Sequence, residues 1–265
     1  MTILDDLFVR LRAEKKKAFI PFVTAGDPSL ECTSKLLQRL DQLGCSIAEI
    51  GIPYSDPIAD GPVIQASYTR ALGRHIKLKQ IFEMVKATAP TVKMPLVTML
   101  SYAVVFRKGP KQFVHEAKQA GLCGAIVPDL LVEECDELAA VCKGEDFNLI
   151  QLVTPTTPRE RAVRIAERSS GFIYFVSVTG ITGERQELPP GLLDQVTWLR
   201  QRTTLPICIG FGISQPEHVK VLAPVADGVI VGSAIVRRIA EAEAAGDEAI
   251  LKNVDELVTS LMRAL

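Results

Sequence analysis

The stretch Ser46–Pro62, SIAEIGIPYSDPIADGP, combines the pattern of a buried strand with three acidic residues. Residues 47–52 form an apolar run of the kind that is typical of a parallel strand buried on both faces, and Glu49 interrupts it. An unpaired carboxylate in such a strand either destabilises the fold or takes up a proton, so we interpret Glu49 as functional. Prolines and glycine then exclude regular structure until Pro62, which favours the first turn of a helix.

Two further acids, Asp56 and Asp60, lie on the loop that follows this strand. Carboxylates at strand ends of α/β proteins are often catalytic. The alternative is structural, with Asp60 as a turn or N-cap residue and Glu49 paired with a buried base. We predict a catalytic role for Glu49 and Asp60 and a structural role in the loop for Asp56.

The composition of the whole chain predicts one enzyme-sized domain over residues 1–265. A hydrophobic content of 48% in 265 residues is enough for one large core, and a net charge of -1 argues against nucleic acid or an anionic membrane as partner. We find no apolar stretch of transmembrane length and no signal peptide, so we expect a cytoplasmic protein. The six cysteines and three histidines lack metal-ligand spacing, which predicts no metal site.

Apolar segments alternate with segments of helical spacing along the chain, which predicts a single (β/α)8 TIM barrel. An amphipathic helix at residues 2–13 can plug one end, and extra helices are expected at 234–244 and 247–263. Asp27 and Pro28 are interpreted as the N-cap and first turn of a helix. The eight strands are predicted at residues 18–24, 46–52, 95–100, 124–127, 148–153, 172–176, 206–209 and 228–231.

Glycine-rich segments follow the last two predicted strands, at residues 210–214 (GFGIS) and 232–235 (GSAI). Backbone amides can approach phosphate oxygens at glycine, and a helix starting at the second segment adds the positive end of its dipole. The position after strands seven and eight of a barrel favours a phosphate site over simple tight turns, with Gly212, Gly232 and Ser233 as ligands.

The types of residue that the predicted strands lack restrict the chemistry. They contain no lysine, so a Schiff-base aldolase has no obvious nucleophile at a strand end. The sequence has no nucleophilic triad and no G-x-G-x-x-G segment opening a βαβ unit. Acid–base catalysis by carboxylates therefore remains as the predicted mechanism.

The order E-I-G-I-P-Y-S-D-P-I-A-D-G-P closely resembles the signature of the tryptophan synthase alpha subunit family, with further matches at residues 127–130 and 154–156. That family is a carbon–carbon lyase that cleaves indole-3-glycerol phosphate to indole and glyceraldehyde 3-phosphate. The resemblance implies that Glu49 carries the proton, that Asp60 accepts the indole N–H, and that Tyr174 is an auxiliary catalytic hydroxyl.

The resemblance also implies a lid in the loop of residues 177–183, where Thr182 contacts Asp60 and Gly183 helps to bind phosphate. From composition alone, this loop is either a mobile lid or a plain surface loop. The indole needs a flat apolar slot, and each residue predicted for it can equally belong to the core. The slot residues, which agree with family positions, are Phe22, Ile64, Leu100, Tyr102, Val127 and Phe211.

In the family, Pro53, Asp56 and Pro57 contact a beta subunit that bears pyridoxal phosphate, so the resemblance implies an α2β2 assembly and no cofactor on this chain. The sequence departs from the family pattern at residues 101–109, where valines 104 and 105 are expected to form apolar surface. Three alternatives stay open: a stand-alone indole-releasing lyase, a catalytically weak regulatory subunit, and another phosphate-binding barrel enzyme such as an isomerase.

Overall fold

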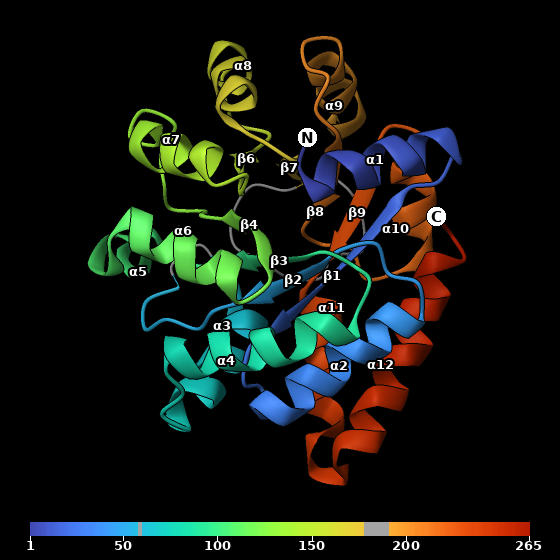
Figure 1. The fold of residues 1–265 in the computed structure, drawn as a ribbon. Coiled ribbons are helices and arrows are strands. Elements are labelled where there is room, and N and C mark those ends of the chain that lie inside the picture. Colours follow the sequence, from blue (N-terminus) through green and yellow to red (C-terminus); the bar gives the residue numbers. More distant parts are fainter. Residues whose placement is uncertain (58–59, 178–190) are drawn as a thin grey trace.

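The computed structural model describes residues 1–57, 60–177 and 191–265, and the strands of these ranges form one parallel sheet (Figure 1). In chain order they are β1 (Ala18–Thr24), β2 (Ala48–Gly51), β3 (Leu96–Met99), β4 (Leu122–Ile126), β5 (Asn148–Ile150), β6 (Leu152–Val153), β7 (Ile173–Val176), β8 (Ile207–Gly210) and β9 (Gly228–Val231). The spatial order β5-β4-β3-β2-β1-β9-β8-β7-β6 begins and ends with neighbours in sequence, so the sheet closes on itself. The predicted barrel is confirmed.

The predicted strand at residues 148–153 is observed as two short strands, β5 and β6. Gln151 separates them, and its carbonyl oxygen accepts a hydrogen bond from the backbone N–H of Tyr174 at 3.1 Å. Strand β5 pairs with β4 and β6 pairs with β7, so this one segment joins the two halves of the sheet. Eight barrel positions are therefore occupied by nine observed strands.

The helices surround the sheet (Figure 1). They are α1 (Ile3–Ala13), α2 (Leu30–Gln42), α3 (Pro62–Gly73), α4 (Leu78–Thr88), α5 (Tyr102–Lys108), α6 (Pro110–Gln119), α7 (Asp136–Gly144), α8 (Arg159–Arg168), α9 (Leu192–Arg200), α10 (Pro216–Leu222), α11 (Ser233–Ala242) and α12 (Asp247–Met262). Short 3-10 turns, η1 (Ala89–Thr91) and η2 (Glu243–Ala245), follow α4 and α11. Within the described ranges, no helix is long and apolar enough to span a membrane.

One local prediction is wrong. Helix α2 is capped by the Ser29 side chain, which accepts the backbone N–H of Cys32, whereas Asp27 precedes the helix and pairs with Arg70. The Asp27 carboxylate has a charged partner that only the folded chain brings near, and Ser29 is the cap residue available at the helix start. After β3, the chain forms α5, with Ser101 as its N-cap.

Helix α1 closes the N-terminal end of the barrel, as predicted. Thr2 and Asp5 form a capping box that starts the helix. Its apolar face packs into the inner core, where the rings of Phe8 and Phe172 lie 5.9 Å apart. At the same end, Asp227 accepts hydrogen bonds from Arg200 and from the backbone N–H of Ile207, and these bonds join α9 to β8.

Alternation along the strands produces two cores. The inner cluster, inside the barrel, includes Ile20 and Phe22 of β1, Ile47 before β2, and Val97 and Met99 of β3. The outer cluster lies between sheet and helices and takes the intervening strand residues. Because Glu49 is two positions beyond Ile47, its side chain points into the barrel.

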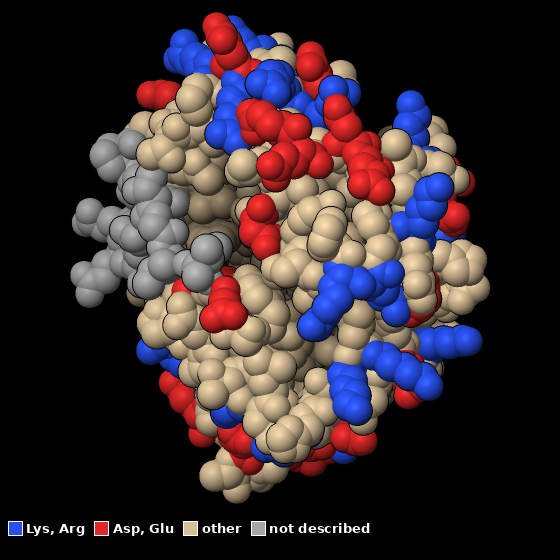
Figure 2. Space-filling view, turned by 90° about the vertical axis from the view of Figure 1, so that its left-hand side faces the viewer, with Lys and Arg blue, Asp and Glu red and all other residues tan. Residues whose placement is uncertain are grey.

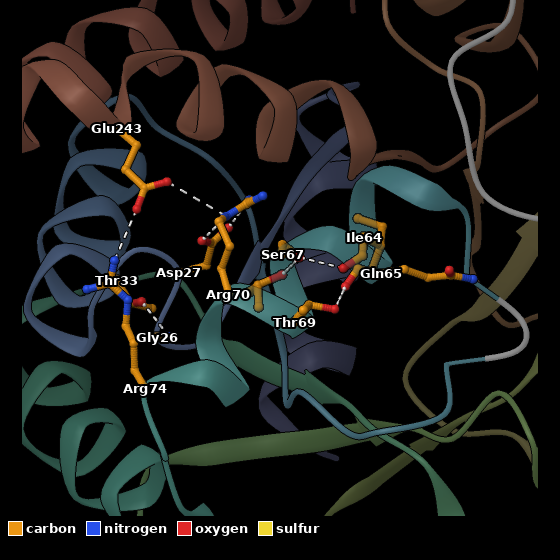
Figure 3. Close-up of polar contacts among 11 residues, drawn as sticks. Gly26, Asp27, Thr33, Ile64, Gln65, Ser67, Thr69, Arg70, Arg74 and Glu243 are labelled. Carbon is orange, nitrogen blue, oxygen red and sulfur yellow. Dashed lines mark hydrogen bonds and ion pairs between the residues drawn. The ribbon is translucent and has the colours of Figure 1, made fainter.

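Helix α3 is fixed to the barrel by a buried ion pair that Figure 3 shows. Arg70 donates two hydrogen bonds to the Asp27 carboxylate, at 2.8 and 2.7 Å, and Asp27 is 2% exposed. Burial raises the pKa of Asp27 despite the opposing effect of Arg70. Glu243 bridges Arg70 and Arg74 at 3.8 and 3.0 Å. This network holds the helix that leads out of the Asp60 loop.

Replacing Arg70 by methionine is expected to lower the free energy of unfolding by about 3 kcal/mol, because it leaves the buried Asp27 carboxylate without its partner. Chemical denaturation measures this loss. The matched control is Arg74→Met, which removes an arginine that is half exposed and, among the described residues, pairs with Glu243; we expect it to cost less than about 1 kcal/mol. Equal effects of the two variants would contradict the role given to the buried pair.

Candidate active site

A cavity opens at the C-terminal ends of the strands and contains most of the predicted site residues. The predicted site residues that line it are Phe22, Glu49, Asp60, Ile64, Tyr174, Phe211, Gly212, Gly232 and Ser233. These residues come from six separate segments of the chain, between β1 and the start of α11. The surface shown in Figure 2 is hollowed, with acidic side chains near the hollow and charges of both signs elsewhere.

Glu49 is held inside the barrel by its strand. In β2 it lies in register with Phe22 of β1 and Val97 of β3, and the residue is 1% exposed. Its Oε2 atom has no hydrogen-bond partner among the described residues. Burial, and to a smaller extent the charge of Asp60, raises the pKa of Glu49 from its ordinary 4.5 to about 8. The carboxyl is therefore protonated at neutral pH.

Asp60 also lines the cavity, from the position just before α3. The N-cap of this helix is Gly61, so the alternative that Asp60 serves as the N-cap is wrong. The main chain of Asp60 is fixed, since its carbonyl oxygen accepts a hydrogen bond from Gln65 Nε2 at 2.7 Å. Burial raises the pKa of Asp60 to about 6, below that of Glu49. At neutral pH the pair thus consists of one charged and one protonated acid.

The raised pKa of Glu49 makes the stability of the protein depend on pH. The folded state keeps a proton on Glu49 up to pH 8, whereas the unfolded state loses it at pH 4.5, so wild-type stability falls as pH rises through this interval. Glu49→Gln carries no such proton. We expect its stability relative to wild type to rise by up to about 1.4 kcal/mol per pH unit in that window.

Denaturant unfolding at a series of pH values measures this difference. Glu83→Gln on α4 is a suitable control, because Glu83 is exposed and its ion pair in the described part of the chain, with Lys79 at 3.8 Å, is at the surface. Its difference from wild type is expected to stay constant with pH. A Glu49→Gln difference that is also constant would mean that Glu49 is ionised in the folded protein at neutral pH.

Tyr174 reaches the cavity from β7 and packs against the strand next to it. A Cβ atom on Gly210 would lie 2.5 Å from the Tyr174 hydroxyl, so only glycine leaves room for this ring. Phe211 contacts the same ring edge-on, with centroids 5.8 Å apart. Burial, together with the nearby Glu49 and Asp60, raises the pKa of Tyr174 well above 10, so its hydroxyl stays protonated and can donate.

The predicted phosphate segments lie side by side at the cavity. Phe211 and Gly212 both have φ of 74°, and the strained conformation of Phe211 is typical of a functional loop. The Ser177 hydroxyl donates to the Phe211 carbonyl oxygen and fixes this turn. Helix α11 begins at Ser233, with its N-terminus at the cavity, where its free amides and dipole favour an anion.

Three residues predicted for the apolar slot are not among those that line the cavity. Leu100 and Val127 belong to the outer cluster, and Tyr102 lies on α5 against that cluster. The reason is strand parity: a shift of one residue along a strand moves the side chain to the opposite face of the sheet. Met99 therefore lines the cavity in the place predicted for Leu100.

The prediction missed Met99, Ile213 and Ile230, which also line the cavity. Alternation was the signal that can find two of them, because Met99 follows the inward Val97 by two positions and Ile230 follows Gly228 in the same way. Ile213 lies in the loop after β8 and carries no such periodic signal.

Other predicted residues lie at the rim or outside the described ranges. Pro53 is buried, Pro57 is half-buried and Asp56 is exposed, whereas Thr182 and Gly183 lie outside the residues that the structure describes. Val105 is fully buried in the outer cluster, so the expectation that it forms apolar surface is wrong. The large apolar residue that α5 exposes is Phe106, at 70%. The described ranges contain no cluster of potential metal ligands.

The fold and the cavity define a (β/α)8-barrel enzyme whose candidate active site combines two buried acids of different pKa with an anion-favouring helix terminus. The family model described as tryptophan synthase alpha chain matches residues 8–265. The chain therefore belongs to the tryptophan synthase alpha chain family.

Individual relatives agree with this assignment. The tryptophan synthase alpha chain of Rhodopirellula baltica is 58% identical over 91% of this chain and 88% of its own length, and that of Arabidopsis thaliana is 41% identical over 99% and 95%. The solved subunit alpha from Legionella pneumophila superposes with a TM-score of 0.91 at 36% identity, covering 100% of this chain and 98% of its own. A chain of the Pyrococcus furiosus α2β2 complex superposes with a TM-score of 0.86 at 38% identity, covering 93% and 98%.

Proposed function

We propose that this chain cleaves indole-3-glycerol phosphate to indole and glyceraldehyde 3-phosphate, as the alpha component of tryptophan synthase in tryptophan biosynthesis. The observation that carries the proposal is the pair formed by Glu49 and Asp60 in one cavity, with pKa values of about 8 and about 6. When their surroundings give two acids different pKa values, one can be protonated and the other ionised at the same pH, so the two can play different catalytic roles.

The first step is protonation of the indole ring at C3. Glu49 enters the reaction protonated and donates its proton to this carbon, which places positive charge on the ring nitrogen. Asp60 is ionised at the same pH, and its carboxylate stabilises the charged N–H. Because both side chains are shielded from water, this electrostatic stabilisation is stronger than it is in solution.

The second step is cleavage of the bond between C3 and the glycerol side chain. The Glu49 carboxylate, now charged, removes the proton of the hydroxyl on the carbon next to C3, and this carbon becomes the aldehyde. The electrons of the broken bond return to the ring and neutralise it. Glu49 is thereby protonated again, and Tyr174 supplies a neutral donor beside the reacting carbons.

The phosphate of the substrate is assigned to the glycine segments after β8 and β9. Gly212 supplies a close backbone approach, while Gly232 and Ser233 place the start of α11 beside the ligand. We assign Thr182 and Gly183 to a lid, which remains a proposal on residues outside the described ranges. The apolar slot for the ring is assigned to Phe22, Ile64, Met99 and Phe211, which line the same cavity.

We further propose a beta subunit as partner in an α2β2 assembly, with Pro53, Asp56 and Pro57 at the interface. The relative of known structure in such a complex, from Pyrococcus furiosus, supports this assembly. The protein exchanges only protons with the substrate during the cleavage, so we propose that this chain requires no cofactor, and pyridoxal phosphate would belong to the beta subunit. We also propose that residues 1–265 act as one domain and that the protein works in the cytoplasm.

A stand-alone lyase would use the same cavity, and the difference would lie only in the response to a beta subunit. A regulatory subunit would not need the acid pair, and an isomerase would not need an apolar slot beside it. The test is a coupled assay of glyceraldehyde 3-phosphate released from indole-3-glycerol phosphate. We expect release by this chain and faster release with a beta subunit; no release under either condition would refute the lyase.

A further inference from the structure

The turn after β8 contains a residue in a conformation that its type disfavours. Phe211 has φ of 74°, in the left-handed region that glycine adopts readily and phenylalanine does not. Gly212 follows with the same φ and needs no support to keep it. A residue such as Phe211 keeps this conformation only where its surroundings hold it there, and such residues cluster at functional sites. The contacts of Phe211 therefore show what holds the turn in place.

Ser177, the residue directly after β7, bonds this turn twice. Its backbone N–H donates to the Gly210 carbonyl oxygen at 2.9 Å, which continues the pairing of β7 with β8 beyond Val176. Its hydroxyl donates to the Phe211 carbonyl oxygen, one residue further along. Ser177 is 0% exposed, so water does not compete for this bond. One buried serine thus fixes two successive carbonyl groups of the turn.

The bond from the Ser177 hydroxyl also determines the direction of the next amide. In a planar trans peptide the C=O and N–H groups point in opposite directions, so the Phe211 carbonyl and the Gly212 N–H are fixed together. Ser177 is not one of the described residues that line the cavity, whereas Phe211 and Gly212 both line it. Because the carbonyl is turned toward Ser177, the peptide can present its N–H on the cavity side.

We propose that Ser177 is a positioning residue for the phosphate site, whose hydroxyl holds the peptide between Phe211 and Gly212 so that the Gly212 N–H is directed at a phosphate oxygen. This deepens the proposed function and rests on its assignment of the phosphate to Gly212. Without the hydroxyl, Phe211 is expected to relax toward negative φ, which rotates the peptide and withdraws its N–H. With the hydroxyl, the amide is already aimed and needs no reorganisation when the anion binds.

The first test observes the Gly212 amide without the substrate. The pair Phe-Gly occurs once in the sequence, so protein labelled with 13C at phenylalanine carbonyls and 15N at glycine gives one HNCO signal, from this peptide. Titration with inorganic phosphate is expected to shift the signal of the wild type. In Ser177→Ala the carbonyl carbon should lose the shift caused by its hydrogen bond. The phosphate concentration at half of the change should rise about tenfold, the scale of one bond to a charged group.

Ser169→Ala is the matched control for this titration. The Ser169 hydroxyl also donates to a backbone carbonyl oxygen, that of Ile165 at 2.7 Å, but it does so at the C-cap of α8, before β7. The control should bind phosphate with wild-type affinity. Unchanged phosphate binding in Ser177→Ala would overturn the proposal, and so would a wild-type Gly212 amide that does not respond to phosphate. Both results are independent of whether the chain cleaves indole-3-glycerol phosphate.

Kinetics supply the second test. A bond to the phosphate stabilises the bound substrate and the transition state alike, so we expect Ser177→Ala to raise KM about tenfold and to change kcat less than about twofold. Indoleglycerol, the substrate without its phosphate, separates this role from a general effect on the fold. The variant should lose much less kcat/KM on indoleglycerol, because no phosphate is there to meet the amide. An equal loss on both substrates would show that Ser177 stabilises the fold and does not act on the phosphate.

Discussion

The Glu49→Gln protein is expected to release glyceraldehyde 3-phosphate at least ~100-fold more slowly than wild type, the usual effect of removing an acid–base group. Glutamine fills the same space in β2 but neither gives a proton to indole C3 nor takes one from the side-chain hydroxyl. Because Glu49 acts in both steps, the loss should appear in kcat. Substrate affinity should change little, since the apolar slot and phosphate segments are untouched.

The measurement is the coupled aldehyde assay at substrate saturation, with Glu83→Gln as the control for a glutamate-to-glutamine change on an exposed helix. The wild-type profile of kcat/KM should fall above pH 8, where Glu49 loses its proton. Turnover by Glu49→Gln within a few-fold of wild type, with the fold intact, would exclude Glu49 as the proton carrier.

Asp60→Asn is expected to lower kcat by ~100-fold or more, which is typical when a preorganised electrostatic partner of a developing charge is removed. Asparagine still accepts a hydrogen bond from the ring N–H, but it lacks the negative charge that stabilises the protonated indole. The acid limb near pH 6, which reflects ionisation of Asp60, should disappear.

A second effect of Asp60→Asn follows from the coupling of the two acids. The charge of Asp60 contributes to the raised pKa of Glu49, so its removal should lower the pKa of Glu49 and move the remaining basic limb to lower pH. Both limbs are read from one kcat/KM profile. If the acid limb survives unchanged in Asp60→Asn, another group produces it and the assignment of Asp60 fails.

Much of the fold could be predicted because the strands and helices of the barrel correspond to local patterns of apolar and polar residues. Apolar runs such as residues 18–24 and 228–231 agree with β1 and β9 at both ends. The errors arise where a contact distant in sequence determines the local structure. Asp27 pairs with Arg70 and does not cap α2. The predicted strand at residues 148–153 is divided because its first part pairs with β4 and its second part pairs with β7.

The candidate site was predictable where a residue type contradicts its surroundings. Glu49 in an apolar strand and Asp60 after it both line the cavity. Leu100 and Val127 were misplaced because the sequence does not fix which face of the sheet the last residue of a strand points to. A shift of one residue moves the side chain from the inner core to the outer core.

The sequence by itself determined the class of fold, the family, and the two acids that the proposed chemistry uses, because these depend on periodicity and on residue types at strand ends. Only the tertiary structure decided which apolar side chains form the cavity and that Arg70 supports α3 from the Asp27 side. These features depend on distances between segments far apart in the chain, which local patterns do not encode.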